Sequence, residues 1–267
     1  MAQLGRHPGA GRTVAALALL ALAVAVFVSL GRWQLGRAHE RRAIAQAIEA
    51  GRAQAPLALS PEVDAGELRP WRAARASGRW RHELSVLVDN RNLDGRPGLW
   101  LATPLEFDGG RGQAVLVLRG WMARPLGGEP LPAVPRPQGR QTVEGELAAR
   151  VPRMFELPGA HSELPQGWPG PAAPDGLPRV QNLDLDALAR ASGLALLPAV
   201  LMQTSPAGDG LARQWPQPSV DADQNVGYAL QWFSFAAIAA IAWLAVAARA
   251  WRRRASNRIP ERRDKTT

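Results

Sequence analysis

The stretch TVAALALLALAVAVFVSL, residues 13–30, runs for 18 positions without a charged side chain. At about 1.5 Å of rise per residue, a helix of this length crosses most of a hydrocarbon core. A cleaved secretory signal has a shorter apolar core and a small-residue cleavage site, whereas this run continues into Gly31-Arg32-Trp33. We therefore expect an uncleaved transmembrane helix over residues 13–31.

A second charge-free run, QNVGYALQWFSFAAIAAIAWLAVAA, occupies residues 224–248 near the other end of the chain. Basic residues follow it directly, namely Arg249, Arg252, Arg253, Arg254 and Arg258. Because loops rich in Lys and Arg stay in the cytoplasm, we expect a transmembrane helix over 224–248 and a basic cytoplasmic tail over 249–267.

The charges around the first helix favour the opposite orientation. Two arginines, Arg6 and Arg12, precede it, and four follow it, namely Arg32, Arg37, Arg41 and Arg42. Charges in a long translocated segment have little influence on topology, and the segment between the two runs is long. We therefore expect residues 1–12 in the cytoplasm, residues 32–223 as a periplasmic domain, and a bacterial inner-membrane location.

Three short runs in the middle of the chain predict an antiparallel meander. They are rich in apolar and β-branched residues: Leu84–Asn90, Leu99–Leu105 and Gln113–Arg119. Asp94-Gly95 and Asp108-Gly109-Gly110, which lie between them, are residues that reverse a chain. Further strands are expected at Trp71–Gly78, Thr142–Leu147 and Ala199–Gln203.

One short helix is signalled at both ends. Asp184 is placed to cap its N-terminus, Leu185 and Leu188 give an apolar stripe, and Gly193 is placed to end it. Proline and glycine are frequent in 125–139 and 158–178, so these segments are expected to be long surface connections. The expected fold class is an α+β membrane protein with two transmembrane helices that flank a predominantly antiparallel β extracytoplasmic domain containing at least one short helix.

Composition excludes several kinds of function. The chain has no cysteine, which excludes thiol redox chemistry and thiolate metal sites. Its four histidines, His7, His39, His82 and His161, lack the close spacing of a metal site. The net charge is +9, but the densest basic run follows an apolar helix, where it sets topology rather than binding nucleic acid.

Three motifs, taken together and in this order, carry a family resemblance. They are Gly31-Arg32-Trp33-Gln34-Leu35 with Arg37; Pro97-Gly98 and Thr103-Pro104-Leu105 leading to Val117-Leu118-Arg119-Gly120-Trp121; and Gly227-Tyr228-Ala229-Leu230-Gln231-Trp232-Phe233. The chain resembles the Surfeit locus protein 1 (Shy1-like) family, whose members assist cytochrome c oxidase assembly. From the residues alone, Arg119-Gly120-Trp121 also has a structural explanation, as a strand end whose Trp packs on the sheet.

The resemblance implies an assembly factor, not an enzyme, for a haem-copper oxidase. Such a factor assists haem a insertion or stabilises the catalytic subunit, with haem a as a transient cofactor. The implied partners are that subunit and the haem a synthesis machinery. In many relatives an Asn-His pair stands where this chain has Gln224 and Asn225, and the histidine is a proposed haem ligand. Asparagine is not a customary axial ligand, so the resemblance does not extend to iron ligation here.

The two terminal motifs are expected to meet at one membrane depth, because the two helices are antiparallel. Helical spacing places Asn225, Tyr228, Gln231 and Trp232 on one side of the second helix. A haem-binding or partner-binding surface is therefore expected from Trp33, Gln34, Arg37, Tyr228, Gln231 and Trp232. Interfacial anchoring is an alternative for the aromatic residues, because Trp and Tyr collect at membrane interfaces in any case.

Two other classes of function remain open. A pure membrane scaffold would hold oxidase subunits without binding haem, and the absence of histidine at position 225 favours it. A membrane-anchored periplasmic enzyme is less favoured, because the sequence has no nucleophile motif, metal cluster or pair of catalytic carboxylates.

Overall fold

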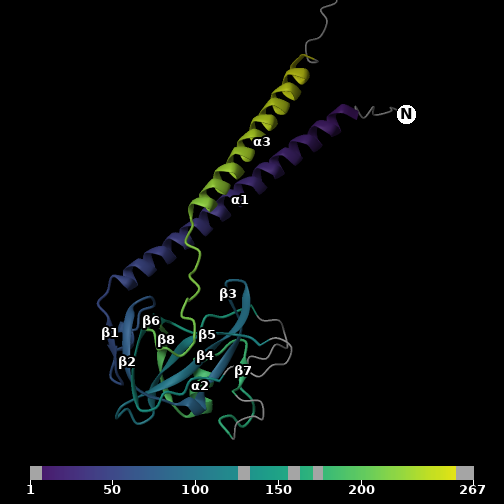
Figure 1. The fold of residues 1–267 in the computed structure, drawn as a ribbon. Coiled ribbons are helices and arrows are strands. Elements are labelled where there is room, and N and C mark those ends of the chain that lie inside the picture. Colours follow the sequence, from purple (N-terminus) through teal and green to yellow (C-terminus); the bar gives the residue numbers. More distant parts are fainter. Residues whose placement is uncertain (1–7, 126–132, 156–162, 171–176, 257–267) are drawn as a thin grey trace, which may run out of the picture. The chain divides into compact units, whose positions relative to one another are not determined.

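The computed structural model describes residues 8–125, 133–155, 163–170 and 177–256 (Figure 1). The chain forms two compact units, one from residues 1–45 with 218–267 and one from residues 46–217. The elements in chain order are α1 (Pro8–Arg52), β1 (Leu57–Leu59), β2 (Ala73–Trp80), β3 (Val86–Leu93), β4 (Arg96–Phe107), β5 (Gln113–Ala123), β6 (Arg140–Ala148), β7 (Arg179–Val180), α2 (Leu185–Ser192), β8 (Ala195–Gln203) and α3 (Asp223–Ser256). Short 3₁₀ helices lie at Ala65–Glu67 and His82–Leu84.

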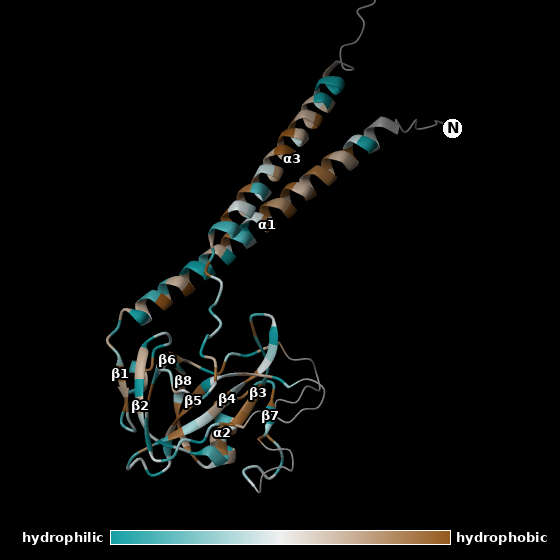
Figure 2. Ribbon diagram, viewed as in Figure 1, coloured by the Kyte–Doolittle hydropathy of each residue, from teal (hydrophilic) through white to brown (hydrophobic). Residues whose placement is uncertain are grey.

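Both terminal helices are long and apolar enough to cross a membrane. Figure 2 shows the apolar stretch along each of them. Large apolar side chains such as Leu19, Leu22, Ile238 and Ile241 are exposed on these helices, as expected of surfaces that lipid covers. These two helices suggest association with a membrane.

Helix α1 extends well past the span of 13–31 expected from hydropathy. Residues 32–50 hold mainly alanine, arginine, glutamate and glutamine and no proline, so nothing stops the helix at the end of its apolar run. It ends at Arg52, shortly before Pro56. The α-helix therefore continues for about 30 Å beyond Gly31 at the usual rise per residue.

The β domain is built on a closed ring of strands. The sheet order is β1-β2-β6-β8-β5-β4-β3-β7, and an additional pairing of β2 with β4 closes the five strands β2, β6, β8, β5 and β4 on themselves. One edge of the long β4 makes this closure possible, since it pairs with β3 along 96–102 and with β2 along 105–107. Antiparallel pairs predominate, with parallel pairs at β1–β2, β3–β7 and β5–β8. The predicted α+β fold class is confirmed.

The predicted meander is β3, β4 and β5, paired antiparallel in that order. Leu93 pairs with Arg96 across a two-residue turn, in which Asp94 and Gly95 have φ of 50° and 79°. Positive φ at both central residues is the type I′ geometry that fits the twist of a hairpin. The expected strands at 71–78, 142–147 and 199–203 correspond to β2, β6 and β8.

The predicted short helix is α2, and both of its predicted caps are present. The carboxylate of Asp184 accepts a hydrogen bond from the Ala187 N–H at 2.9 Å, and Gly193 ends the helix with φ of 71°. Leu188 is fully buried in a cluster with Trp100 and Met202, on the outer side of the ring. Half of the residues of the two expected surface connections, 125–139 and 158–178, lie outside the described residues, and the other half are in neither a helix nor a strand.

Apolar residues fill the inside of the ring. This inner cluster contains Leu105, Phe107, Val115, Val117, Val143, Leu147 and Leu201. Alternate residues of the same strands, such as Leu116 and Leu118, face the outer cluster under α2. The two clusters explain why β4 and β5 are almost continuously apolar, since both of their faces are buried.

Residues 204–217, here called the strap, follow β8 and are bound to the domain at several points. Ala212 exchanges backbone hydrogen bonds with Trp121 of β5 at 2.7 and 2.9 Å. The indole of Trp215 donates to the Gln203 carbonyl at 2.8 Å and packs edge-on against Trp100. These contacts hold the segment that leads to α3 firmly against the sheet.

A buried ionic cluster also anchors the strap. Both oxygens of Asp209 accept hydrogen bonds from Arg213 at 2.7 Å, and Asp209 lies 3.7 Å from a guanidinium nitrogen of Arg119. Arg119 is fully buried beneath the ring of Trp80 and donates to the Pro135 carbonyl at 2.8 Å. Burial lowers the pKa of Arg119, and the nearby Asp209 opposes that shift.

Arg52, the last residue of α1, is a second tie between the strap and the sheet. Its guanidinium donates to Glu146 of β6 at 2.8 Å and to the Gln217 side chain at 2.8 Å. It also lies 5.9 Å from the centre of the Trp71 ring. Because arginine stays protonated at physiological pH, its contact with Glu146 is an ion pair.

Candidate functional site

Residues 27–42 of α1 lie against residues 221–235, which are the start of α3 and the two residues before it; together they are here called the paired segment. Phe27 of α1 packs with Trp232 and Phe235 of α3, while Arg41 contacts Asp221. Higher numbers in α1 thus meet lower numbers in α3, so the two helices are antiparallel here. The paired segment contains the first and the last of the three sequence motifs.

Polar contacts join the two helices at the end of the paired segment where α3 begins. The Asn225 side-chain N–H₂ donates to the Gln34 Oε1 at 2.6 Å. The Arg41 guanidinium donates to the Asp221 carbonyl at 2.6 Å, and Arg42 lies 4.0 Å from the Asp223 carboxylate. A specific amide pair with two flanking arginine contacts therefore fixes the register of the helices.

Small and aromatic residues make the adjoining contacts. An ideal Cβ placed on Gly31 would lie 2.7 Å from the Phe233 ring, so only glycine permits this approach. The rings of Phe27 and Trp232 are stacked with their centres 5.8 Å apart. Ala38 and Ala229 are both almost completely buried. The helices are therefore closely packed rather than merely adjacent.

The structure divides the predicted site residues into two groups. Gln34 and Trp232 are partly buried between the helices, with Asn225 beside Gln34. Trp33 and Tyr228 are 58% and 48% exposed, and the remaining two, Arg37 and Gln231, are also exposed. Arg37 pairs with Glu40 of its own helix at 2.8 Å. The four exposed residues are available to a partner, and their use as a binding surface stays a prediction.

The four residues expected to form one stripe on α3 do not all face the same way in the structure. Asn225 and Trp232 face α1, whereas Tyr228 and Gln231 do not. Phe233, which is not part of the expected stripe, also faces α1. The reason is that the contact follows a seven-residue repeat in α3, with one series at Ala222, Ala229 and Ala236 and another at Asn225, Trp232 and Ala239.

Sequence reasoning missed Phe27, Gly31, Ala38 and Ala229 as contact residues. Their signal was present as spacing, since Phe27, Gly31, Gln34 and Ala38 recur at intervals of four, three and four. That alternation is typical of a helix that packs along its length against another helix.

The paired segment offers little that would hold haem iron. Asn225 lies at the position of the family's proposed ligand, its amide nitrogen is engaged by Gln34, and asparagine is not a customary haem ligand. Among the described residues of the paired segment, Tyr228 on α3 and the exposed His39 on α1 are of a type that can ligate haem iron. The described residues hold no group of three or more His, Cys, Asp or Glu that could bind a metal ion.

The middle motif has a structural role in the β domain. Trp121 packs so closely on Gly98 that an ideal Cβ there would lie 2.3 Å from the indole. The Trp121 indole donates to the Arg91 carbonyl at 2.9 Å, and Gly120 has a φ of 155° next to Leu211 of the strap. Arg119 anchors the strap as described above. This motif therefore builds the domain rather than a binding site.

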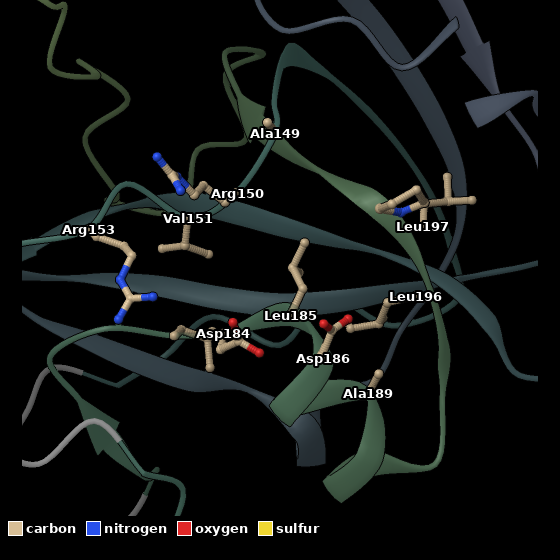
Figure 3. A pocket seen from close by; sticks show the side chains of 12 residues that line it. Ala149, Arg150, Val151, Arg153, Asp184, Leu185, Asp186, Ala189, Leu196 and Leu197 are labelled. Atoms are coloured by element: carbon tan, nitrogen blue, oxygen red, sulfur yellow. The ribbon is translucent and has the colours of Figure 1, made fainter. Parts of the chain in front are cut away.

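A cavity of about 320 Å³ lies between the end of β6, the start of β8 and α2 (Figure 3). Arg150 and Arg153 line one side, and Asp184 and Asp186 at the start of α2 line another, with Leu185 and Leu196 between them. Asp184 already caps α2. The cavity has mixed charge and an apolar floor, and none of the three sequence motifs contributes to it.

Comparison with known proteins matches residues 21–237 to the SURF1 (Surfeit locus protein 1) family. Uncharacterized SURF1-like proteins of Mycobacterium bovis and Mycobacterium tuberculosis are each 25% identical over 233 residues, which is 85% of this chain and 79% of the relative. The matched range includes all three motifs and the whole paired segment.

Proposed function

This chain belongs to the SURF1 family, and from that premise we propose that it is an assembly factor for a haem-copper oxidase. The family is generally linked to cytochrome oxidase assembly, and its members are assembly factors rather than enzymes. The factor acts on the oxidase catalytic subunit during maturation, either by assisting haem a insertion or by stabilising the subunit before haem a is inserted.

One observation supports the proposal most directly. Two family motifs that are far apart in the sequence touch each other, with Asn225 hydrogen-bonded to Gln34 across 191 positions and Gly31 packed against Phe233. Hydrophobic anchoring alone does not require an amide pair or a glycine contact. A shaped surface at the ends of the two helices, which presents Trp33 and Tyr228, is a natural place for a membrane-embedded oxidase subunit to dock.

The role toward haem is the finer part of the proposal. Haem a, held transiently, would rest on exposed aromatic residues and pair its carboxylates with Arg32 or Arg37 rather than bind its iron to Asn225. Asn225 stands at the position of the family's proposed haem ligand, is bonded to Gln34 and is not a customary ligand of haem iron. This favours the second candidate, a scaffold that holds the subunit and touches no haem. Haem retention by the purified protein separates these two forms of the same function.

We place the protein in the bacterial inner membrane with both termini in the cytoplasm. The basic residues that follow the apolar part of α3, among them Arg252, Arg253 and Arg254, support this orientation. The β domain then lies in the periplasm, where the absence of cysteine spares it from oxidative pairing.

Gene deletion tests the function. In a strain without a second family member, deletion should lower the amount of assembled haem-copper oxidase, measured by difference spectra and oxygen consumption, while total haem stays largely unchanged. Expression of the wild-type chain should restore the oxidase, whereas the chain without α3 should not. Normal oxidase spectra and activity in the deletion strain would refute the proposal, and a general loss of haem would indicate a role in haem synthesis instead.

A further inference from the structure

The depth of α3 in the membrane is ambiguous from its sequence. Its charge-free run covers 224–248, which is 25 residues, whereas that of α1 covers 13–30, which is 18. A hydrocarbon core of roughly 30 Å needs about 20 helical residues. The run in α3 is therefore several residues longer than the core requires, and hydropathy alone does not show which of its residues lie in lipid and which in water.

The register of the paired segment gives a reference level. Gly31 directly follows the apolar run of α1 and precedes Arg32, and it meets Phe233 of α3. Phe27, one turn earlier, stacks on Trp232. Because the helices are antiparallel, residues of α3 before Trp232 lie beside the part of α1 that begins at Arg32.

Charged residues of α1 accompany this first part of α3. Arg41 donates to the Asp221 carbonyl and Arg42 lies near the Asp223 carboxylate. Arg41 is ten residues beyond Gly31, which corresponds to about 15 Å along the helix. Arginine and aspartate avoid the hydrocarbon core, so the start of α3 lies outside it.

Asn225 gives an independent indication. Its Oδ1 atom is buried in the paired segment, and no hydrogen-bond donor reaches it among the described residues. A polar pair with an unsatisfied acceptor is more costly in hydrocarbon, where its surroundings are wholly apolar, than beside the polar groups of the headgroup layer. The amide pair is thus better suited to the headgroup layer than to the core.

We propose that α3 enters the hydrocarbon core only at about Trp232, and that its first two turns, residues 223–230, stand in the lipid headgroup layer beside residues 32–42 of α1. The remaining apolar run, 232–248, is 17 residues and matches the 18 of α1. Trp33 and Tyr228, both about half exposed, then lie at the depth where aromatic residues contact lipid headgroups. The inference rests on the proposed membrane insertion. It implies that a partner that binds Trp33 and Tyr228 does so at the membrane surface.

The absence of cysteine allows a direct test by single substitutions in the full chain. Gly227→Cys reports on the start of α3, and Ile238→Cys on its apolar part. Gly36→Cys and Leu22→Cys are the corresponding controls on α1. Protein does not block these positions, because Ile238 and Leu22 are 64% and 60% exposed and a Cβ at Gly227 or Gly36 meets nothing within 4 Å. A charged, membrane-impermeant maleimide is added to intact spheroplasts and to permeabilised cells.

Gly227→Cys should react at a rate within a few-fold of Gly36→Cys, and both should react about tenfold or more faster than Ile238→Cys and Leu22→Cys. All four should react equally in denaturant. Labelling of Gly227→Cys as slow as that of Ile238→Cys would overturn the inference. Fast labelling of Gly227→Cys and Gly36→Cys only after permeabilisation would support the depth and reverse the proposed orientation. Equally fast labelling of all four in the native state would reject membrane insertion, and the inference with it. The assay needs neither oxidase nor haem, so its result is separate from that of the gene deletion.

Discussion

Asn225 is the residue that best separates the two forms of the proposed function. Asn225→His restores the residue type proposed as the haem ligand in relatives, and imidazole is a strong axial ligand. We expect this variant, purified from cells that make haem a, to retain more haem than the wild type, measured by its absorption spectrum. Tyr228→Phe should change haem retention little, because the ring that contacts haem is kept.

The opposite pattern would contradict this account. If Asn225→His leaves the haem content unchanged while Tyr228→Phe abolishes it, ligation by tyrosine is the better explanation. Asn225→Ala is the matched control, since it removes the Gln34 contact without adding a ligand. A gain seen with both His and Ala would come from opening of the helix pair rather than from ligation.

Asp209 is the single anion between two buried guanidinium groups, Arg119 and Arg213. Asp209→Ala leaves both cations without this partner, and removal of one member of a buried ionic cluster costs about 3–5 kcal/mol. Asp108→Ala, at a 40% exposed carboxylate that pairs with Arg79 and Arg140, should cost about 1 kcal/mol or less. Urea unfolding of the detergent-solubilised proteins, followed by tryptophan fluorescence, measures both. Equal stability of the two variants would show that the strap is held by its other contacts.

Residues with local signals were predictable and residues in long-range contacts were not. The Asp184 cap, the Gly193 terminator and the Asp94-Gly95 turn each depend on a few neighbouring residues. The partner of Arg119, in contrast, lies 90 positions away in the strap, and nothing near Asp209 in the sequence points to it. Gln34 was predicted as part of the site, but its bond to Asn225 required the helix register.

At the level of elements, Gly31 should determine how closely α1 and α3 pack. In Gly31→Leu the new side chain meets the Phe233 ring, so the helices must move apart. Overpacking of this kind typically costs about 1–3 kcal/mol. We expect a lower melting temperature in detergent and faster proteolysis in the linker at 218–222.

Gly36→Leu is the matched control for Gly31→Leu, because a Cβ at Gly36 meets nothing within 4 Å. Leucine has a higher helix propensity than glycine, by nearly 1 kcal/mol, so this variant should be as stable as the wild type or slightly more so. A loss of stability in Gly36→Leu equal to that in Gly31→Leu would indicate a general effect on α1 rather than loss of the Phe233 contact.

Strands and helices were predicted to different degrees. The strands of the meander are short apolar runs separated by turn residues, and each was found within a few residues of its place. The full extent of α1 was missed because hydropathy detects only the part in lipid, while residues 32–52 are helical through propensity and packing. β1 and β7, with three and two residues, exist only because neighbouring strands offer an edge.

For the whole molecule, the orientation in the membrane is the prediction with the widest consequences. A reporter that is active only in the periplasm should be active when inserted at position 150, in the β domain, and inactive when fused to the C-terminus. The basic residues after α3 give the reason, since such segments are retained in the cytoplasm. Activity at the C-terminus, or silence at position 150 with the protein stably expressed, would reverse the assignment.

The closed ring of five strands affects how readily the domain aggregates with other polypeptide chains. An open sheet exposes unpaired backbone groups along its outer strands, and other chains can add to such edges and aggregate. Among the described strands, ring closure leaves β1 and β7 as the two end strands of the sheet, with only three and two residues. Such a domain can therefore remain next to an incompletely assembled partner, among unfolded polypeptides, without adding their strands to its sheet.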